Sequence, residues 1–157
     1  MTGRAPEPVG GRGDGRPEET WGATGDADGV PGVVRLRPPT TAAVARSQVR
    51  RLLRGRPAAP SDAIVDDILI VVTELITNAF RHGGGMTAFD AFLDDGFLVV
   101  RVTDASTAPP RTVPRDDPAA PGGFGWPLVQ RLSRHVTVTA VPGGKTIQVV
   151  LAAGPTA

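Results

Sequence analysis

Residues 61–85 read SDAIVDDILIVVTELITNAFRHGGG, and this stretch decides the fold of the chain around it. Its apolar residues recur at intervals of three and four, which is the period of an α-helix with one buried face. Ser61 is a good N-terminal cap, and the glycines from Gly83 onward end the run. The pattern predicts one long amphipathic helix, whose buried face carries Ile64, Ile68, Val72, Leu75 and Ala79.

The segment before this helix predicts a short strand and another helix. Residues 34–36 suit an edge strand, which the prolines at 38 and 39 stop. A helix then runs from a cap at Thr40 or Thr41 to Gly55, and its apolar residues are Val44, Val49, Leu52 and Leu53.

After the glycines the period changes from helical to alternating, which is typical of strands. Residues 89–102 alternate around an Asp-Asp-Gly turn and predict a hairpin. Residues 104–122 form a proline-rich loop, long enough to be a candidate lid. A short helix over 126–134 and a second hairpin over 136–151 complete the chain. The order predicts an α+β fold, a two-layer α/β sandwich with a mostly antiparallel sheet and its helices on one face.

Composition divides the chain into one domain and two tails. Its 157 residues suit one domain of ordinary size. Residues 1–29 hold eight glycines, with three arginines against six acidic residues, a net charge of −3. Such a segment buries too little apolar surface to offset its ordering entropy, so we expect a disordered tail there. We expect a folded domain over 30–152 and a flexible C-terminus over 153–157.

Charge and residue content exclude several classes of function. The 17 Lys+Arg and 16 Asp+Glu leave a net charge of +1, without the basic stripe that direct nucleic-acid binding needs. The absence of cysteine excludes disulfides, thiolate catalysis and Cys-ligated zinc. No stretch approaches the roughly 18 apolar residues of a membrane helix, and no signal-peptide pattern begins the sequence. We therefore expect a cytoplasmic protein without a membrane partner.

Glu74 and Asn78 are the first candidate site residues. They lie four positions apart on the predicted long helix, so they share one side of it beside the apolar stripe. A carboxylate there can orient or deprotonate a water or hydroxyl, and an amide oxygen can ligate Mg²⁺. The alternative interpretation is a solvated polar face of the helix.

Two polar residues at strand ends are candidate contacts for a nucleobase. Asp104 directly follows a predicted strand, where its carboxylate can accept a hydrogen bond from an exocyclic amine such as that of adenine. The alternative is an aspartate that stabilises its own turn. Thr146, in the pair Lys145-Thr146 after the last turn, can place a hydroxyl near a base, although a β-branched residue also suits the start of a strand.

A glycine-flanked helix start is a candidate phosphate site. Gly123 and Gly125 precede the predicted short helix, and Pro127 occupies its first turn. Backbone N–H groups at the positive end of a helix dipole suit a polyphosphate. The alternative is that these glycines only form the loop that ends where the helix begins. The segment matches neither a Walker loop nor a dinucleotide-binding motif.

Taken together, these segments resemble the ATP-binding domain shared by gyrase, the Hsp90 chaperone, histidine kinases and MutL. More narrowly, they are similar to the stand-alone bacterial anti-sigma-factor serine kinases. The resemblance spans roughly residues 33–151 and depends on the order of four segments: ELITNAFRH at 74–82, VTDASTAP at 102–109, GGFGWPLV at 122–129 and GGKT at 143–146.

The resemblance implies a Bergerat-type ATP-binding fold, in which ATP lies between the helix layer and a mobile lid. By position, Glu74 matches the catalytic base and Asn78 the magnesium ligand. Asp104 matches the adenine-binding aspartate, Gly123 and Gly125 the lid glycines near the phosphates, and Thr146 the threonine beside the adenine. The implied cofactors are ATP and Mg²⁺.

The resemblance also implies partners: an anti-anti-sigma protein that is phosphorylated on serine, and a sigma factor that is sequestered. Whether the chain forms a homodimer is left open. Ser106 stands where the superfamily has glycine, which predicts a tighter loop, and Phe124 stands where the kinases often have arginine. The second departure motivates an alternative hypothesis, a non-catalytic module that uses ATP to order its lid and bind a protein partner.

Overall fold

The computed structural model describes residues 34–35, 38–110 and 125–154. Within them the chain forms three helices and five strands, which are β1 (Val34–Arg35), α1 (Ala42–Arg54), α2 (Asp62–Arg81), β2 (Met86–Asp94), β3 (Phe97–Asp104), α3 (Gly125–Leu132), β4 (His135–Val141) and β5 (Gly144–Ala152). The element order predicted from the sequence is confirmed. The predicted tail, residues 1–29, and most of the predicted loop lie outside the described residues, as do Gly123 and Phe124.

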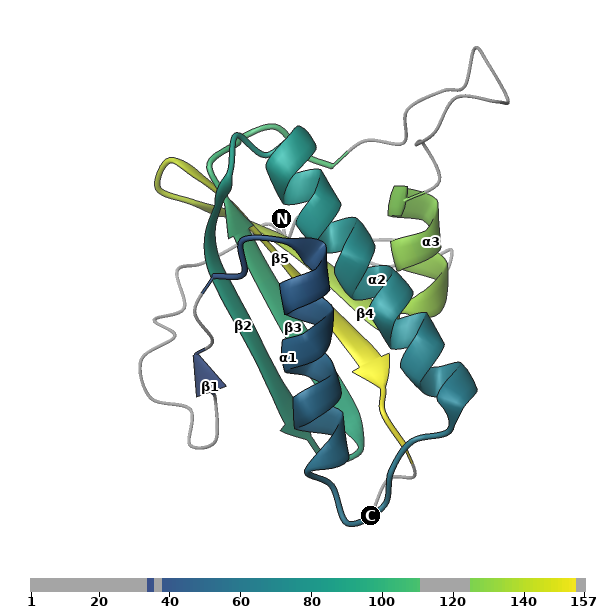
Figure 1. Cartoon of the computed structure of the whole chain (residues 1–157). Helices are drawn as coiled ribbons and strands as arrows, with labels where there is room; N and C mark the ends of the chain where they lie inside the picture. Colours follow the sequence, from purple (N-terminus) through teal and green to yellow (C-terminus); the bar gives the residue numbers. More distant parts are fainter. Residues whose placement is uncertain (1–33, 36–37, 111–124, 155–157) are drawn as a thin grey trace, which may run out of the picture.

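The five strands form one sheet in the order β1-β2-β3-β5-β4, and every neighbouring pair is antiparallel. The helices lie on one face of this sheet, with α2 between α1 and α3 (Figure 1). The predicted fold class, an α+β two-layer sandwich, is therefore confirmed. No helix in the described part of the chain is long and apolar enough to cross a lipid bilayer.

The caps predicted for the two long helices are present. The Thr41 hydroxyl accepts a hydrogen bond from the backbone N–H of Val44 at 3.2 Å at the start of α1. At the start of α2 the Ser61 hydroxyl accepts one from Ile64 at 3.4 Å. Each cap satisfies one of the N–H groups that a helix start leaves without an intrahelical partner.

Two boundaries differ from those that the sequence predicts. The third helix ends at Leu132 and not at Arg134, because the Arg134 N–H already donates to the carbonyl of Val150 in β5, at 2.8 Å. Ala153, assigned to a flexible C-terminus, is buried. Its N–H donates to Gly96 at 2.8 Å and its carbonyl accepts from the Arg56 guanidinium at 2.5 Å, so the chain is packed at this residue.

The core lies between the helix layer and the sheet, and apolar area removed from water there stabilises the sandwich. Its fully buried large side chains are Phe89, Ile68, Leu75, Ile76, Leu98, Leu151, Val49, Val71, Val72, Val100, Val102 and Val129. Because α2 contributes five of these residues, the core fixes its orientation on the sheet and with it the direction of its polar side chains.

The register of the two central strands decides which residues face the helices. Val100 of β3 lies opposite Val149 of β5, and both are buried in the core. Side chains alternate between the faces of a sheet, so every second residue in either direction shares the side of this pair. At the end of the ladder this rule places Asp104 and its partner Lys145 on the helix face.

Candidate functional site

Glu74 and Asn78 lie one helical turn apart in the C-terminal half of α2, and both are half-buried. The neighbouring Leu75, Ile76 and Ala79 are buried in the core, which sets the rotation of α2 about its axis. The two polar side chains therefore lie at the margin of the core. Within the described part of the chain, neither the carboxylate nor the amide takes part in a hydrogen bond or ion pair.

The Glu74 carboxylate lies against the first residue of α3. A Cβ placed on Gly125 would overlap the carboxylate oxygen Oε2 and lie 3.2 Å from Cδ of Glu74. Only glycine leaves this space. The first turn of a helix presents N–H groups without intrahelical partners and the positive end of the helix dipole. The packing of α2 against α3 thus brings together two of the predicted site residues.

Asp104 ends β3, and it is only 3% exposed. Its Oδ1 accepts a hydrogen bond from the Ser106 N–H at 3.0 Å, which closes a tight turn. Gly83, just after α2, packs on the other side, because a Cβ there would lie 2.6 Å from both Cγ and Oδ2 of Asp104. The alternative interpretation of Asp104, a residue that stabilises its own turn, therefore describes part of what this carboxylate does.

Lys145 also contacts Asp104 and Ser106, and the sequence analysis assigned it no role. Its Nζ lies 2.9 Å from Oδ2 and 3.0 Å from Oδ1 of Asp104, and it donates to the Ser106 carbonyl at 3.3 Å. The whole residue is 7% exposed, so the pair is buried. The signal that would have found it is strand register: the two residues are directly opposite in the ladder, which sequence spacing alone does not reveal.

Thr146 lies on the other face of the sheet. Its hydroxyl is 2.8 Å from the hydroxyl of Thr103, the residue directly opposite in β3. Because side chains alternate along a strand, Thr146 cannot share the face of Asp104 while Lys145 does. The structure therefore does not bring Thr146 together with the other predicted site residues, and the β5 side chain beside Asp104 is that of Lys145.

Among the described residues, Asn78 is a candidate oxygen donor to a magnesium ion that binds together with a nucleotide. The described residues contain no group of three or more His, Cys, Asp or Glu side chains that could hold a metal. Mg²⁺ bound with a nucleotide usually takes one or two protein oxygens, and phosphates and waters complete its octahedron. The amide oxygen of Asn78 is a suitable ligand of this kind, one turn from Glu74.

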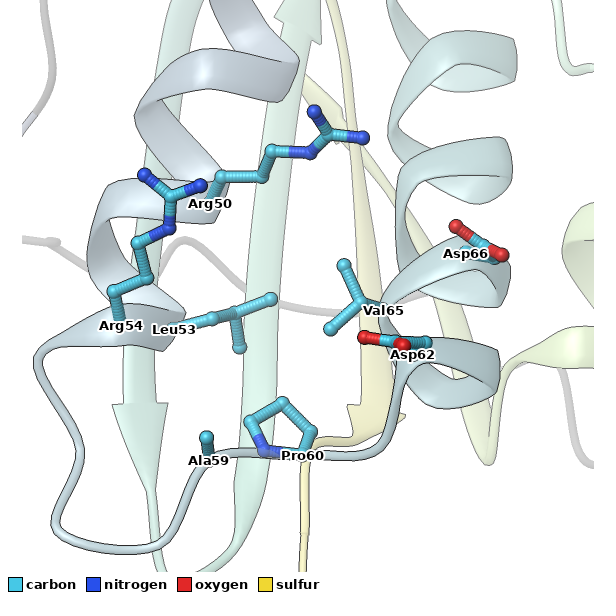
Figure 2. A pocket seen from close by; sticks show the side chains of 8 residues that line it. All are labelled: Arg50, Leu53, Arg54, Ala59, Pro60, Asp62, Val65 and Asp66. Atoms are coloured by element: carbon cyan, nitrogen blue, oxygen red, sulfur yellow. The ribbon is translucent and has the colours of Figure 1, made fainter.

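A cavity of about 500 Å³ lies elsewhere, at the opposite end of α2 (Figure 2). Arg50 and Arg54 of α1 line one side, and Asp62 and Asp66 of α2 line the other. From Asp66 to Asn78 the helix advances roughly 18 Å. This cavity is therefore separate from the predicted nucleotide site.

Comparison with known proteins gives a family match and a solved structure of similar fold. A family model described as a histidine kinase-like ATPase domain matches residues 36–151. Among solved structures, the chain is similar to the RsbU and RsbW domains of Rv1364c from Mycobacterium tuberculosis, with a TM-score of 0.54 and 20% sequence identity. The match covers 80% of this chain and 32% of that one, so the chain spans about a third of its length. At this identity the likeness shows a shared fold. No curated protein matches the chain.

Proposed function

The chain belongs to the histidine kinase-like ATPase family, and from this premise we propose that it is an ATP-binding regulatory protein that phosphorylates a serine or threonine of a protein partner. The observation that carries the proposal is the contact between Glu74 and Gly125. A carboxylate suited to receive a proton lies beside a helix start suited to bind phosphate. Phosphoryl transfer needs these two groups close together, because its catalysis is mostly positioning and charge stabilisation.

The phosphate end of the nucleotide has groups of this chain that could hold it. The free N–H groups at the start of α3 would bind the phosphates, and the absence of a side chain at Gly125 lets them approach Glu74. The amide oxygen of Asn78 would ligate Mg²⁺. When bound, the ion supplies positive charge that offsets the charge developing on the transferred group.

Glu74 would act on the substrate hydroxyl. The hydroxyl oxygen forms a bond to the γ-phosphorus, the bond from that phosphorus to the β,γ-bridging oxygen breaks, and Glu74 takes the hydroxyl proton. Glu74 is half-buried, and its carboxylate lies against the first residue of α3, where the phosphates would bind. Its freedom from hydrogen bonds within the described residues leaves a lone pair for the proton.

We further propose that the partner is an anti-anti-sigma protein and that the chain sequesters a sigma factor. The support is the resemblance of four ordered segments to the stand-alone anti-sigma-factor kinases, together with the small two-layer sandwich observed here. The competing hypothesis is a switch that binds ATP and a partner without transferring phosphate.

The first test is calorimetric titration with ATP, with and without Mg²⁺, followed by incubation of γ-labelled ATP with candidate anti-anti-sigma proteins. We expect Glu74→Gln to retain ATP binding while slowing label transfer by about 10² to 10⁴, the usual contribution of a general base. The matched control is Asp67→Asn, which neutralises an exposed carboxylate on the same helix and should transfer label normally.

Three outcomes separate the hypotheses. Binding with transfer that depends on Glu74 supports the kinase. Binding without any transfer to any candidate supports the non-catalytic switch. Equal transfer by wild type and Glu74→Gln would remove Glu74 from the mechanism.

A further inference from the structure

The buried pair of Asp104 and Lys145 bears on how the proposed nucleotide site recognises a base. Lys145 is the one lysine in a sequence whose other basic side chains, besides the two histidines, are all arginine. It is buried at 7% exposure beside the carboxylate that the family resemblance assigns to adenine. The only lysine of the sequence is thus buried against the Asp104 carboxylate and is not a surface residue.

The acceptor capacity of the Asp104 carboxylate is largely taken within the chain. Oδ1 accepts from the Ser106 N–H at 3.0 Å and from the Lys145 ammonium, also at 3.0 Å. Oδ2 is 2.9 Å from the same ammonium, and Gly83 packs against this oxygen. Each carboxylate oxygen has two lone pairs, so one lone pair of Oδ2 remains without a donor. Asp104 is only 3% exposed, so this remaining lone pair is covered.

A base amine that approaches Asp104 must therefore compete with an ammonium. A hydrogen bond from an ammonium to a carboxylate adds the attraction between two full charges to the bond that a neutral amine would make with the same carboxylate. The exocyclic amine of adenine is a neutral donor, whereas Lys145 is a charged one that the Ser106 carbonyl also holds, at 3.3 Å. Lys145 therefore binds the Asp104 carboxylate more favourably than the adenine amine would. Unlike a nucleotide from solution, Lys145 loses no translational freedom when it makes this contact.

We propose that Lys145 determines the base selectivity of the nucleotide site by competing with the 6-amino group for Asp104. This inference rests on the proposed nucleotide-binding function and goes beyond it. Its consequence is that the 6-amino group contributes little to affinity, which comes mainly from the phosphates. The wild-type chain then discriminates weakly between nucleotides with and without that group.

The experiment compares ATP with purine riboside triphosphate, which lacks only the 6-amino group, in calorimetric titrations with Mg²⁺. We expect the two dissociation constants of the wild-type chain to agree within about threefold. In Lys145→Met the carboxylate is released to the base, so ATP should bind at least about tenfold more tightly than the analogue, the usual worth of a hydrogen bond to a charged group. The control is Arg101→Met, which removes a positive charge on the other face of the sheet and should keep the weak selectivity.

A measurement on the wild-type chain covers the case in which Lys145→Met does not fold. Because the chain has one lysine, ¹³C-lysine labelling yields a single side-chain signal from Lys145. We expect ATP and the analogue to leave this signal at the same position. A shift with ATP alone would show that the amine displaces Lys145, which would overturn the inference.

The outcomes separate this inference from the proposed function. A preference of the wild-type chain for ATP above about tenfold overturns the inference and leaves the nucleotide site intact. Equal selectivity in wild type and Lys145→Met also overturns it. Failure of both nucleotides to bind overturns the proposed function and the inference with it.

Discussion

Gly125→Ala is the substitution that most directly tests the contact between α2 and α3. The added Cβ would overlap Oε2 of Glu74 and lie 3.2 Å from its Cδ, whereas ordinary carbon contacts begin near 3.4 Å. The carboxylate is the end of a flexible side chain, so it can move aside, by about 1 Å. A displacement of this size at a reacting group lowers a rate by about 10²-fold. The cost in stability should be small, since alanine favours a helix over glycine by up to about 1 kcal/mol.

The expected result is therefore a loss of catalysis without a loss of fold. The melting temperature should stay level or rise, and the rate of ADP formation from labelled ATP should fall by about 10²-fold. The matched control is Gly55→Ala, where the added Cβ meets its nearest atom, the Leu52 carbonyl oxygen, at an ordinary 3.5 Å, so the rate should not change. A Gly125→Ala protein with the wild-type rate would refute the role assigned to the contact, as would a melting temperature far below that of the control.

Three further predictions follow from the same site. Gly83→Ala should lower the free energy of unfolding by about 1–3 kcal/mol in urea denaturation. The added Cβ would lie 2.6 Å from Cγ of Asp104 and 2.7 Å from the carbonyl oxygen of Ala79, and this backbone oxygen cannot move aside. An unchanged urea midpoint would contradict this packing. Asp104→Asn should lower the free energy of unfolding by about 3–5 kcal/mol, because it leaves the Lys145 ammonium buried without a counter-charge. The double variant Asp104→Leu/Lys145→Met, which removes both charges, should recover most of that loss. Equal instability of the single and double variants in the same urea experiment would count against the ion pair. Asn78→Ala should weaken binding of Mg-ATP more than of metal-free ATP in calorimetry, and equal losses would exclude metal ligation by this amide.

The sequence predicted the layers of this fold well because local patterns determine them. The three- and four-residue spacing of Ile64 to Ala79 follows α2, and Ser61 and Thr41 are the caps observed. The hairpins were visible from alternating apolar residues and from an Asp-Asp-Gly turn in which Asp95 and Gly96 both adopt positive φ. These are short-range signals, each contained within a few residues.

The site was harder to predict, because its members meet through contacts distant in sequence. Spacing correctly placed Glu74 and Asn78 on one side of a helix, yet it did not distinguish a ligand site from a polar surface. Thr146 shows the opposite problem. A shift of one residue along a strand changes the face, and the sequence did not indicate which of Lys145 and Thr146 would face Asp104.

What this sequence determined by itself is local: the order of the helices and strands, their approximate ends, which of their faces are apolar, and hence a two-layer sandwich. What only the tertiary structure decided is the set of neighbours. The approach of Gly125 to Glu74 depends on how α3 packs on α2, and the burial of Lys145 on Asp104 depends on the register of β5 against β3. The reason is physical: hydrophobic periodicity is a property of consecutive residues, whereas a contact between side chains 41 positions apart exists only once the core has fixed both backbones.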